Sequence, residues 1–217
     1  MIEIVVTDPG PGLRLGAEHR RELQSQLKNA RRGGANSLLI RVQGDAWAYD
    51  AEFEHEGLTA SQVSSEFHRI VVDLFALDIP TIVFAEGQVT GLGLGLALAA
   101  DLRFATEDAR LAVGAPETAN AFTAGTSWLL NERAGSALGN HLIWTGQSLT
   151  AAEAFQLRLV SNVSVDDAEA RKIATSLAAL PSVANSALKR STTGRLRADL
   201  DAQLDYDSWL AVVAWKD

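Results

Sequence analysis

Cysteine is absent from the 217 residues, which excludes a disulfide framework, a thiolate zinc site and a thiol nucleophile. Histidine is scarce as well, with only 4 residues. His55 lies in an acidic segment, 52–56, but the spacing of the carboxylates around it matches no metal-ligand motif. We therefore expect no metal site, and the lack of cysteine fits a reducing compartment.

Long hydrophobic runs and basic segments are also missing. The longest apolar stretch, 89–100, is interrupted by Thr90 and by glycines, and it is too short to span a bilayer. The N-terminus has no basic segment followed by an apolar one, so it does not resemble a signal peptide. A net charge of −8 and a pI near 5.0 argue against a nucleic-acid partner. We expect a soluble, cytoplasmic protein without membrane or nucleic-acid partners.

Short β-branched segments alternate with amphipathic ones along a chain that is 47% hydrophobic. Strands are expected at 2–7, 37–42, 81–85 and 102–105, helices at 18–30 and 61–77, and a mainly helical pattern from Trp128 onward with breaks near Gly146, 160–165 and Pro181. This alternation favours an α/β fold with parallel strands. The length suits one hydrophobic core. We expect a core at 1–165 and a helical C-terminal region of the same domain at 166–217.

The segment Gly87-Gln88-Val89-Thr90-Gly91-Leu92-Gly93-Leu94-Gly95 follows a predicted buried strand and opens a predicted helix. Glycines at such a point allow a backbone to approach a ligand and leave N–H groups at a helix N-terminus. The spacing is neither that of a dinucleotide-binding turn nor that of a phosphate loop. Taken alone, it is equally well explained by close packing of the helix.

Several motifs in a fixed order resemble the enoyl-CoA hydratase/isomerase (crotonase) superfamily. They are the segment 79–87, with Pro80 before a strand, the segment 91–111, the triplet Trp144-Thr145-Gly146, the segment 150–154 and the pair Leu159-Val160. The resemblance runs from about Ile40 to Val165. It implies a crotonase-like spiral of ββα units with a helical C-terminal region, usually assembled as a homotrimer or hexamer, that binds acyl thioesters.

The resemblance further implies an oxyanion hole made of two backbone N–H groups. One donor falls on Leu92, between Gly91 and Gly93, and the other on Ala51. Such a donor stabilises the enolate charge of the transition state by ~3 kcal/mol. Asp50 stands where the family usually has glycine, and it places a charge beside the hole. Trp47, Tyr49 and Trp144 are candidates to line an acyl pocket, although aromatic residues at such positions are as often plain core.

The catalytic carboxylates match less well. Gly95 stands where the resemblance places the first glutamate. Pro116-Glu117 resembles the pair that carries the second, but ungapped counting puts that position at Ala115 or Gly114. Glu117 is the best candidate proton carrier, with an exposed loop carboxylate as the alternative. His68 is a second candidate, because some relatives use a histidine from the same helix as a base; the alternative is a packing role.

These features favour an enzyme that stabilises an enolate of an acyl thioester, as an isomerase, a dehydratase/hydratase or a decarboxylase. Hydration uses acid/base groups on two reacting atoms, whereas moving a proton between carbons needs one, so the loss of a glutamate weakens hydratase. Coenzyme A or the phosphopantetheine of an acyl carrier protein would be part of the substrate, with no separate cofactor. A role in secondary metabolism such as polyketide biosynthesis rests on association alone. The alternatives are a non-catalytic crotonase-fold binding or scaffold protein and a hydratase that uses Asp50 or Glu52.

Overall fold

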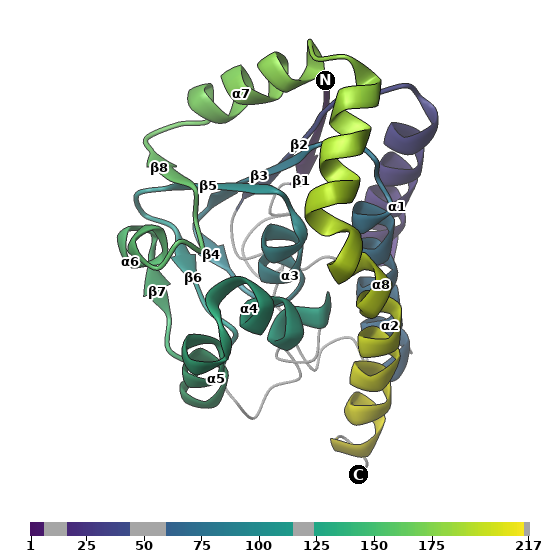
Figure 1. The fold of residues 1–217 in the computed structure, drawn as a ribbon. Coiled ribbons are helices and arrows are strands. Elements are labelled where there is room, and N and C mark those ends of the chain that lie inside the picture. The colour runs from purple at the N-terminus through teal and green to yellow at the C-terminus, as the bar shows by residue number, and fades with distance from the viewer. Residues whose placement is uncertain (7–16, 44–59, 115–123, 215–217) are drawn as a thin grey trace.

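The computed structural model describes residues 1–6, 17–43, 60–114 and 124–214 (Figure 1). Its strands are β1 (Ile2–Val6), β2 (Leu38–Gln43), β3 (Thr81–Glu86), β4 (Gln88–Val89), β5 (Leu102–Thr106), β6 (Arg110–Leu111), β7 (Leu149–Thr150) and β8 (Asn162–Ser164). Its helices are α1 (Ala17–Arg32), α2 (Ala60–Phe75), α3 (Gly91–Ala99), α4 (Thr126–Ala134), α5 (Ser136–Thr145), α6 (Ala151–Gln156), α7 (Ala168–Ala178) and α8 (Ser182–Ala214). The α/β alternation predicted from the sequence is confirmed.

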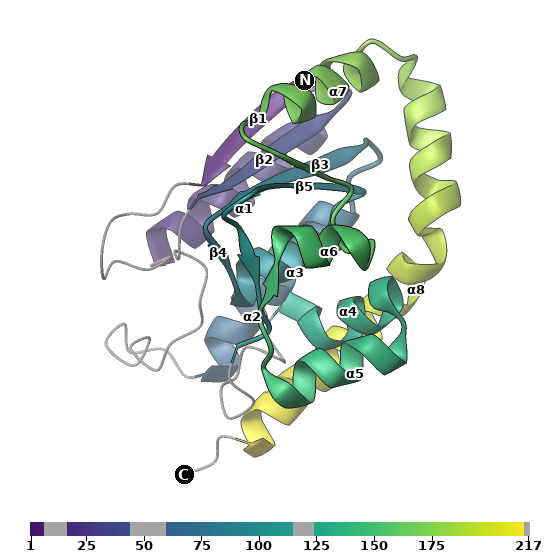
Figure 2. The same cartoon turned by 90° about the vertical axis from the view of Figure 1, so that its left-hand side faces the viewer.

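Two sheets organise the chain. The larger has five parallel strands in the order β1-β2-β3-β5-β8, and the smaller has the order β4-β6-β7. β3 and β5 each turn into a short strand of the smaller sheet, β4 and β6, which pair in parallel. Helix α3 follows β4, so β3, β4 and α3 form one ββα turn of a spiral, seen side-on in Figure 2.

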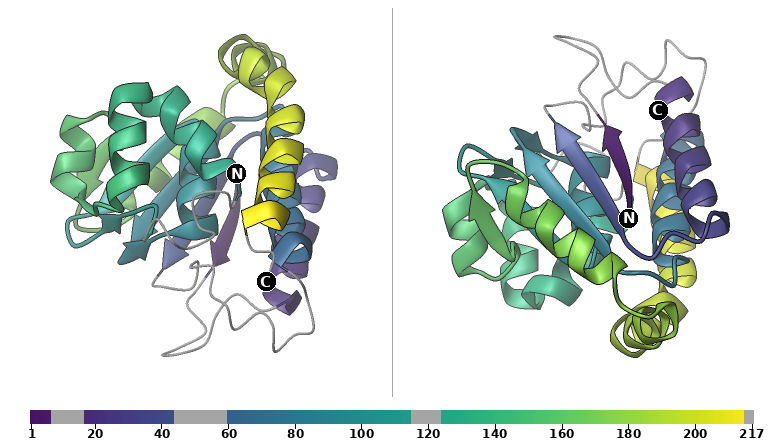
Figure 3. Two further views of the ribbon diagram at one scale, coloured as in Figure 1. Left: turned by 90° about the horizontal axis from the view of Figure 1, so that it is seen from below. Right: turned by 90° about the horizontal axis from the view of Figure 1, so that it is seen from above.

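Both faces of the larger sheet are covered, because successive side chains of a strand point to opposite faces. Leu38, Ile40 and Val42 of β2 join the main hydrophobic cluster beneath α1, α2 and α3. Leu39 points the other way and packs with Phe84 and with residues of α7. Helix α7 therefore covers the second face of the sheet, as the view from above in Figure 3 shows.

The C-terminal half of helix α8 runs alongside α2 (Figure 1). Near the start of α8, Lys189 is buried and donates to both oxygens of Asp101, at 2.9 and 2.7 Å. Asp101 follows α3 and also accepts from the backbone N–H of Thr81 at 2.8 Å. This network fixes α8 to the C-terminal end of α3 and to the beginning of β3.

The long elements agree with the sequence prediction to within a few residues, and the helical pattern breaks at Gly146 and at Pro181 as expected. The short strands β4, β6, β7 and β8 were not predicted as strands. The division at residues 165 and 166 stays a prediction. None of the helices in the described ranges has both the length and the apolar character that crossing a membrane requires.

Candidate active site

The N-terminus of α3 is the feature around which the site is built. All residues from Gly91 to Ala99 are buried, and the N-cap residue Thr90 makes no side-chain capping hydrogen bond. The first N–H groups of a helix have no acceptor within the helix. The N–H of Leu94 already donates to the Thr90 carbonyl at 3.3 Å, which leaves the N–H groups of Leu92 and Gly93 at the helix end. This buried end favours a partial negative charge.

Glycine is required where the chain enters α3. Gly87 has φ +70° and Gly91 has φ +50°, both in the left-handed region that side chains disfavour. At Gly87 the chain changes direction between β3 and β4, and at Gly91 it changes direction between β4 and α3. Gly91 therefore has a backbone reason to be glycine, and its predicted role in binding a thioester stays a prediction.

The position of Gly95 is closed to any side chain. A Cβ built there would lie 2.5 Å from the Ala124 Cβ and 3.0 Å from the Ala124 carbonyl oxygen. Ala124 itself has φ +56° and Gly125 has φ +66°, and the Thr126 hydroxyl donates to the Gly91 carbonyl at 3.5 Å. The 124–126 loop thus rests on the first turns of α3. No glutamate can stand at residue 95 without moving this loop.

His68 lies in the contact between α2 and α8. Its side chain is buried, and its Nδ1 lies 3.0 Å from the Ser208 hydroxyl oxygen of α8. The imidazole is therefore held against α8. Its predicted role as a base stays a prediction.

Most of the other predicted site residues lie in segments that the structure does not describe. Trp47, Tyr49, Asp50, Ala51 and Glu117 lie outside the described residues. Trp144, a candidate either for an acyl pocket or for plain core, is 78% exposed at the end of α5, so in the single chain it fits neither interpretation. The reason is that α5 packs by other residues, among them Gly139 and Leu142.

Asp207 of α8 is a buried carboxylate that the sequence analysis did not single out. It is 1% exposed; its Oδ1 accepts from the Gln203 amide at 2.8 Å, and its Oδ2 is buried without a hydrogen-bond partner. Burial raises the pKa of Asp207 to about 6, and the bond from Gln203 opposes this shift. A signal was present in the sequence, because Leu196, Leu200, Leu204 and Asp207 recur at intervals of four, four and three residues.

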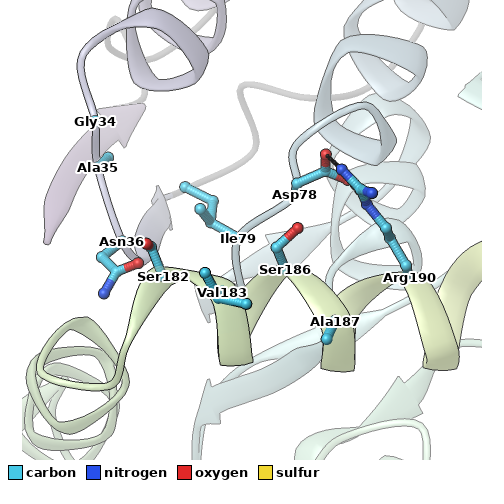
Figure 4. A pocket seen from close by; sticks show the side chains of 10 residues that line it. All are labelled: Gly34, Ala35, Asn36, Asp78, Ile79, Ser182, Val183, Ser186, Ala187 and Arg190. Atoms are coloured by element: carbon cyan, nitrogen blue, oxygen red, sulfur yellow. Dashed lines mark hydrogen bonds and ion pairs between the residues drawn. The ribbon is translucent and has the colours of Figure 1, made fainter.

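Two hollows lined by described residues are poorly suited to chemistry. A groove of about 540 Å³ lies between α8 and the segments that precede β2 and β3, and the ion pair of Asp78 with Arg190 spans part of it (Figure 4). It lies at the amino ends of the parallel strands, whereas ligands of such sheets bind at the carboxyl ends. A second, aliphatic cavity beside Leu94 and Leu98 has a volume of about 10 Å³, enough for one water molecule.

No group of three or more potential metal ligands (His, Cys, Asp or Glu) occurs within the described ranges. What the described residues offer instead is a set of backbone N–H groups at the start of α3, a loop that excludes side chains from residue 95, and a buried carboxylate on α8. Such a set can stabilise an oxyanion and carry a proton.

The sequence profile of a family described as enoyl-CoA hydratase/isomerase matches residues 44–208. YhaR of Bacillus subtilis, which is named for the enoyl-CoA hydratase/isomerase class, is 29% identical over 191 residues, covering 84% of this chain and 74% of YhaR. The cyclohexa-1,5-dienecarbonyl-CoA hydratase of Thauera aromatica is 32% identical over 136 residues, covering 62% of this chain and 52% of that protein.

Solved structures resemble the whole chain. The enoyl-CoA hydratase of Bacillus halodurans superimposes with a TM-score of 0.83 at 18% identity, covering 99% of this chain and 92% of that one. An enoyl-CoA hydratase/isomerase of Pseudoalteromonas atlantica gives a TM-score of 0.81 at 22% identity, covering 99% and 88%. At these identities the likeness establishes the fold, and it confirms the predicted fold class.

Proposed function

The chain belongs to the enoyl-CoA hydratase/isomerase family, and from this premise we propose that it isomerises unsaturated acyl thioesters through an enolate. The Leu92 N–H at the buried end of α3 is one donor to the thioester oxygen. The second donor that we propose is the Ala51 N–H, which lies outside the described residues. Donors placed where negative charge develops stabilise the transition state more than the ground state.

The observation that carries this proposal is the closure of residue 95 by Ala124. Addition of water to a double bond uses acid/base groups on both reacting atoms. The family position for one of the two carboxylates is glycine here, and the loop fills the space that a side chain would need. A single proton carrier is enough to move a proton from C2 to C4 of a β,γ-unsaturated thioester.

We propose coenzyme A as the carrier, because the relatives are named for CoA thioesters. A phosphopantetheine thioester of an acyl carrier protein presents the same arm and is the second carrier to assay. Isomerisation of 3-butenoyl-CoA to crotonyl-CoA should exceed hydration of crotonyl-CoA in the same preparation. Faster hydration would reject isomerase as the main activity.

The oxyanion assignment is tested by Gly91→Ala with Gly34→Ala as its matched control. Both residues have a left-handed backbone, φ +50° and +68°, so both changes strain the chain by about 1–2 kcal/mol. Only Gly91 orients the first N–H groups of α3. We expect Gly91→Ala to lower kcat/KM for 3-butenoyl-CoA at least ~10-fold, and Gly34→Ala to leave it unchanged. Equal losses in the two variants would mean that strain alone is responsible.

A further inference from the structure

The buried face of α8 includes two charged side chains, Lys189 and Asp207. Its buried residues recur every three or four positions, as one face of a helix requires: Asn185, Lys189, Thr193, Leu196, Leu200, Leu204 and Asp207. The three leucines join the main hydrophobic cluster. Lys189 is paired with Asp101, whereas Asp207 occupies a position where the pattern calls for an apolar residue.

Asp207 is not explained by packing. An ionised carboxylate away from water is costly unless it is paired, and the buried Oδ2 of Asp207 has no hydrogen-bond partner. Among the groups described around it, Gln203 is the only one that favours its charged form. From α2, the titratable His68 contacts Ser208, the residue that follows Asp207. The 124–126 loop contributes alanine, glycine and threonine, which do not titrate.

Two residues close to Asp207 on α8, Leu204 and Ser208, contact the 124–126 loop and His68 respectively. Leu204 Cδ2 lies 2.9 Å from the point where a Cβ of Gly125 would stand, so this turn of α8 rests on the loop that closes residue 95. Ser208 binds His68 of α2. Asp207 lies between these two contacts in sequence, one turn beyond Leu204. This part of α8 therefore contacts the 124–126 loop, and the loop in turn packs on α3 at Gly95.

We propose that Asp207 is the proton carrier of the thioester site, an inference that rests on the proposed function. Its carboxylate accepts the proton from C2 of a β,γ-unsaturated thioester. The electron pair of the broken C–H bond forms the enolate, whose charge the Leu92 N–H stabilises at the thioester oxygen. The protonated carboxyl then delivers the same proton to C4 as the C2–C3 double bond forms. One C–H bond is broken and one is formed, and no other reactant is consumed.

The test is the isomerisation of 3-butenoyl-CoA, with exchange of its C2 protons followed by NMR in D₂O. Asp207→Asn keeps the size of the side chain and its bond from Gln203 but cannot accept the proton. We expect kcat and the exchange rate to fall about 100-fold or more with KM nearly unchanged. Asp205→Asn, on the exposed side of the same helix, is the control and should match the wild type. Glu117→Gln tests the competing carboxylate from the sequence.

A second measurement needs no variant. The ¹³C signal of the Asp207 carboxyl should titrate near pH 6, and its midpoint should shift when butyryl-CoA binds. An unchanged midpoint, or turnover by Asp207→Asn equal to that of the wild type, overturns the inference and leaves the proposed function standing. A wild type that binds butyryl-CoA but exchanges no C2 proton of 3-butenoyl-CoA overturns the proposed function together with the inference. A wild type that binds no thioester overturns the proposed function as well, so the two failures are distinguishable.

Discussion

Asp207 makes the stability of the folded chain depend on pH. Burial raises its pKa from 3.8 to about 6, so the folded state holds the proton more tightly than the unfolded state does. The stability that this group contributes is full below pH 3.8 and is lost as the pH rises through about 6. The shift corresponds to about 3 kcal/mol at neutral pH, to order of magnitude.

Asp207→Asn removes this dependence because its amide does not titrate. We expect the variant to have the larger free energy of unfolding at pH 8, and the difference from wild type to shrink as the pH falls from about 6 to about 4. Urea unfolding at several pH values measures it. A difference that stays constant with pH would mean that Asp207 keeps an ordinary pKa in the folded protein. Asp205→Asn, whose side chain is exposed, should show no such trend.

At the scale of elements, the contact between α3 and the 124–126 loop can be measured with two glycines that both lie inside helices. Replacing glycine by alanine within a helix usually stabilises it by about 0.5–1 kcal/mol. Gly194 of α8 has nothing within 4 Å of an added Cβ, so Gly194→Ala should raise Tm. At Gly95 the added Cβ would lie 2.5 Å from the Ala124 Cβ. We expect Gly95→Ala to lower stability by about 1–3 kcal/mol.

The stability of Gly95→Ala indicates whether a catalytic glutamate for hydration could be introduced at residue 95. If Gly95→Ala is as stable as wild type, the 124–126 loop can move at little cost in free energy. A glutamate at residue 95 then becomes a reasonable way to introduce hydratase activity. If Gly95→Ala is destabilised as expected, Gly95→Glu should fail to fold or displace the loop. Thermal melting followed by circular dichroism separates the two outcomes.

The elements with strong periodicity were predictable from the sequence, because burial on one face leaves a pattern over many residues. α2 and β3 are examples. The family resemblance pointed to Gly91 and Leu92 at the glycine turn, and their roles at a thioester stay predictions. The strands β4, β6 and β7 have two residues each, too few for any periodic pattern. They exist because they pair with one another across the chain.

Asp207 was missed for a different reason. Its burial depends on α8 packing against segments far away in sequence, the 124–126 loop and α2. The spacing of Leu196, Leu200 and Leu204 points to residue 207 as the next buried position, but an aspartate is usually exposed unless it is paired. Only the packing shows that the pattern continues through it.

At the scale of the whole molecule, the outer side of α8 carries an apolar strip that the single chain leaves uncovered. Tyr206 and Trp209 stack with ring centroids 5.8 Å apart, and they are 53% and 56% exposed; Val213 continues the strip one turn on. Contiguous exposed aromatic residues mark contact surfaces. We therefore keep the prediction of a homotrimer or a dimer of trimers, in which this strip faces a second copy of the chain.

Sedimentation velocity tests this assembly, with Trp209→Lys as the variant and Val165→Lys as the control. Val165 is 84% exposed but lies outside α8, so its change should leave the mass unaffected. Trp209→Lys should weaken association at least ~10-fold, because truncating a central aromatic anchor typically costs 2 kcal/mol or more. A wild type that is monomeric at micromolar concentration contradicts the prediction.

Tyr206 and Trp209 lie on the opposite side of α8 from Leu204 and Asp207, so association would also hold the last turns of α8 in place. Turnover per chain should then fall on dilution below the dissociation constant, and earlier for Trp209→Lys than for the control.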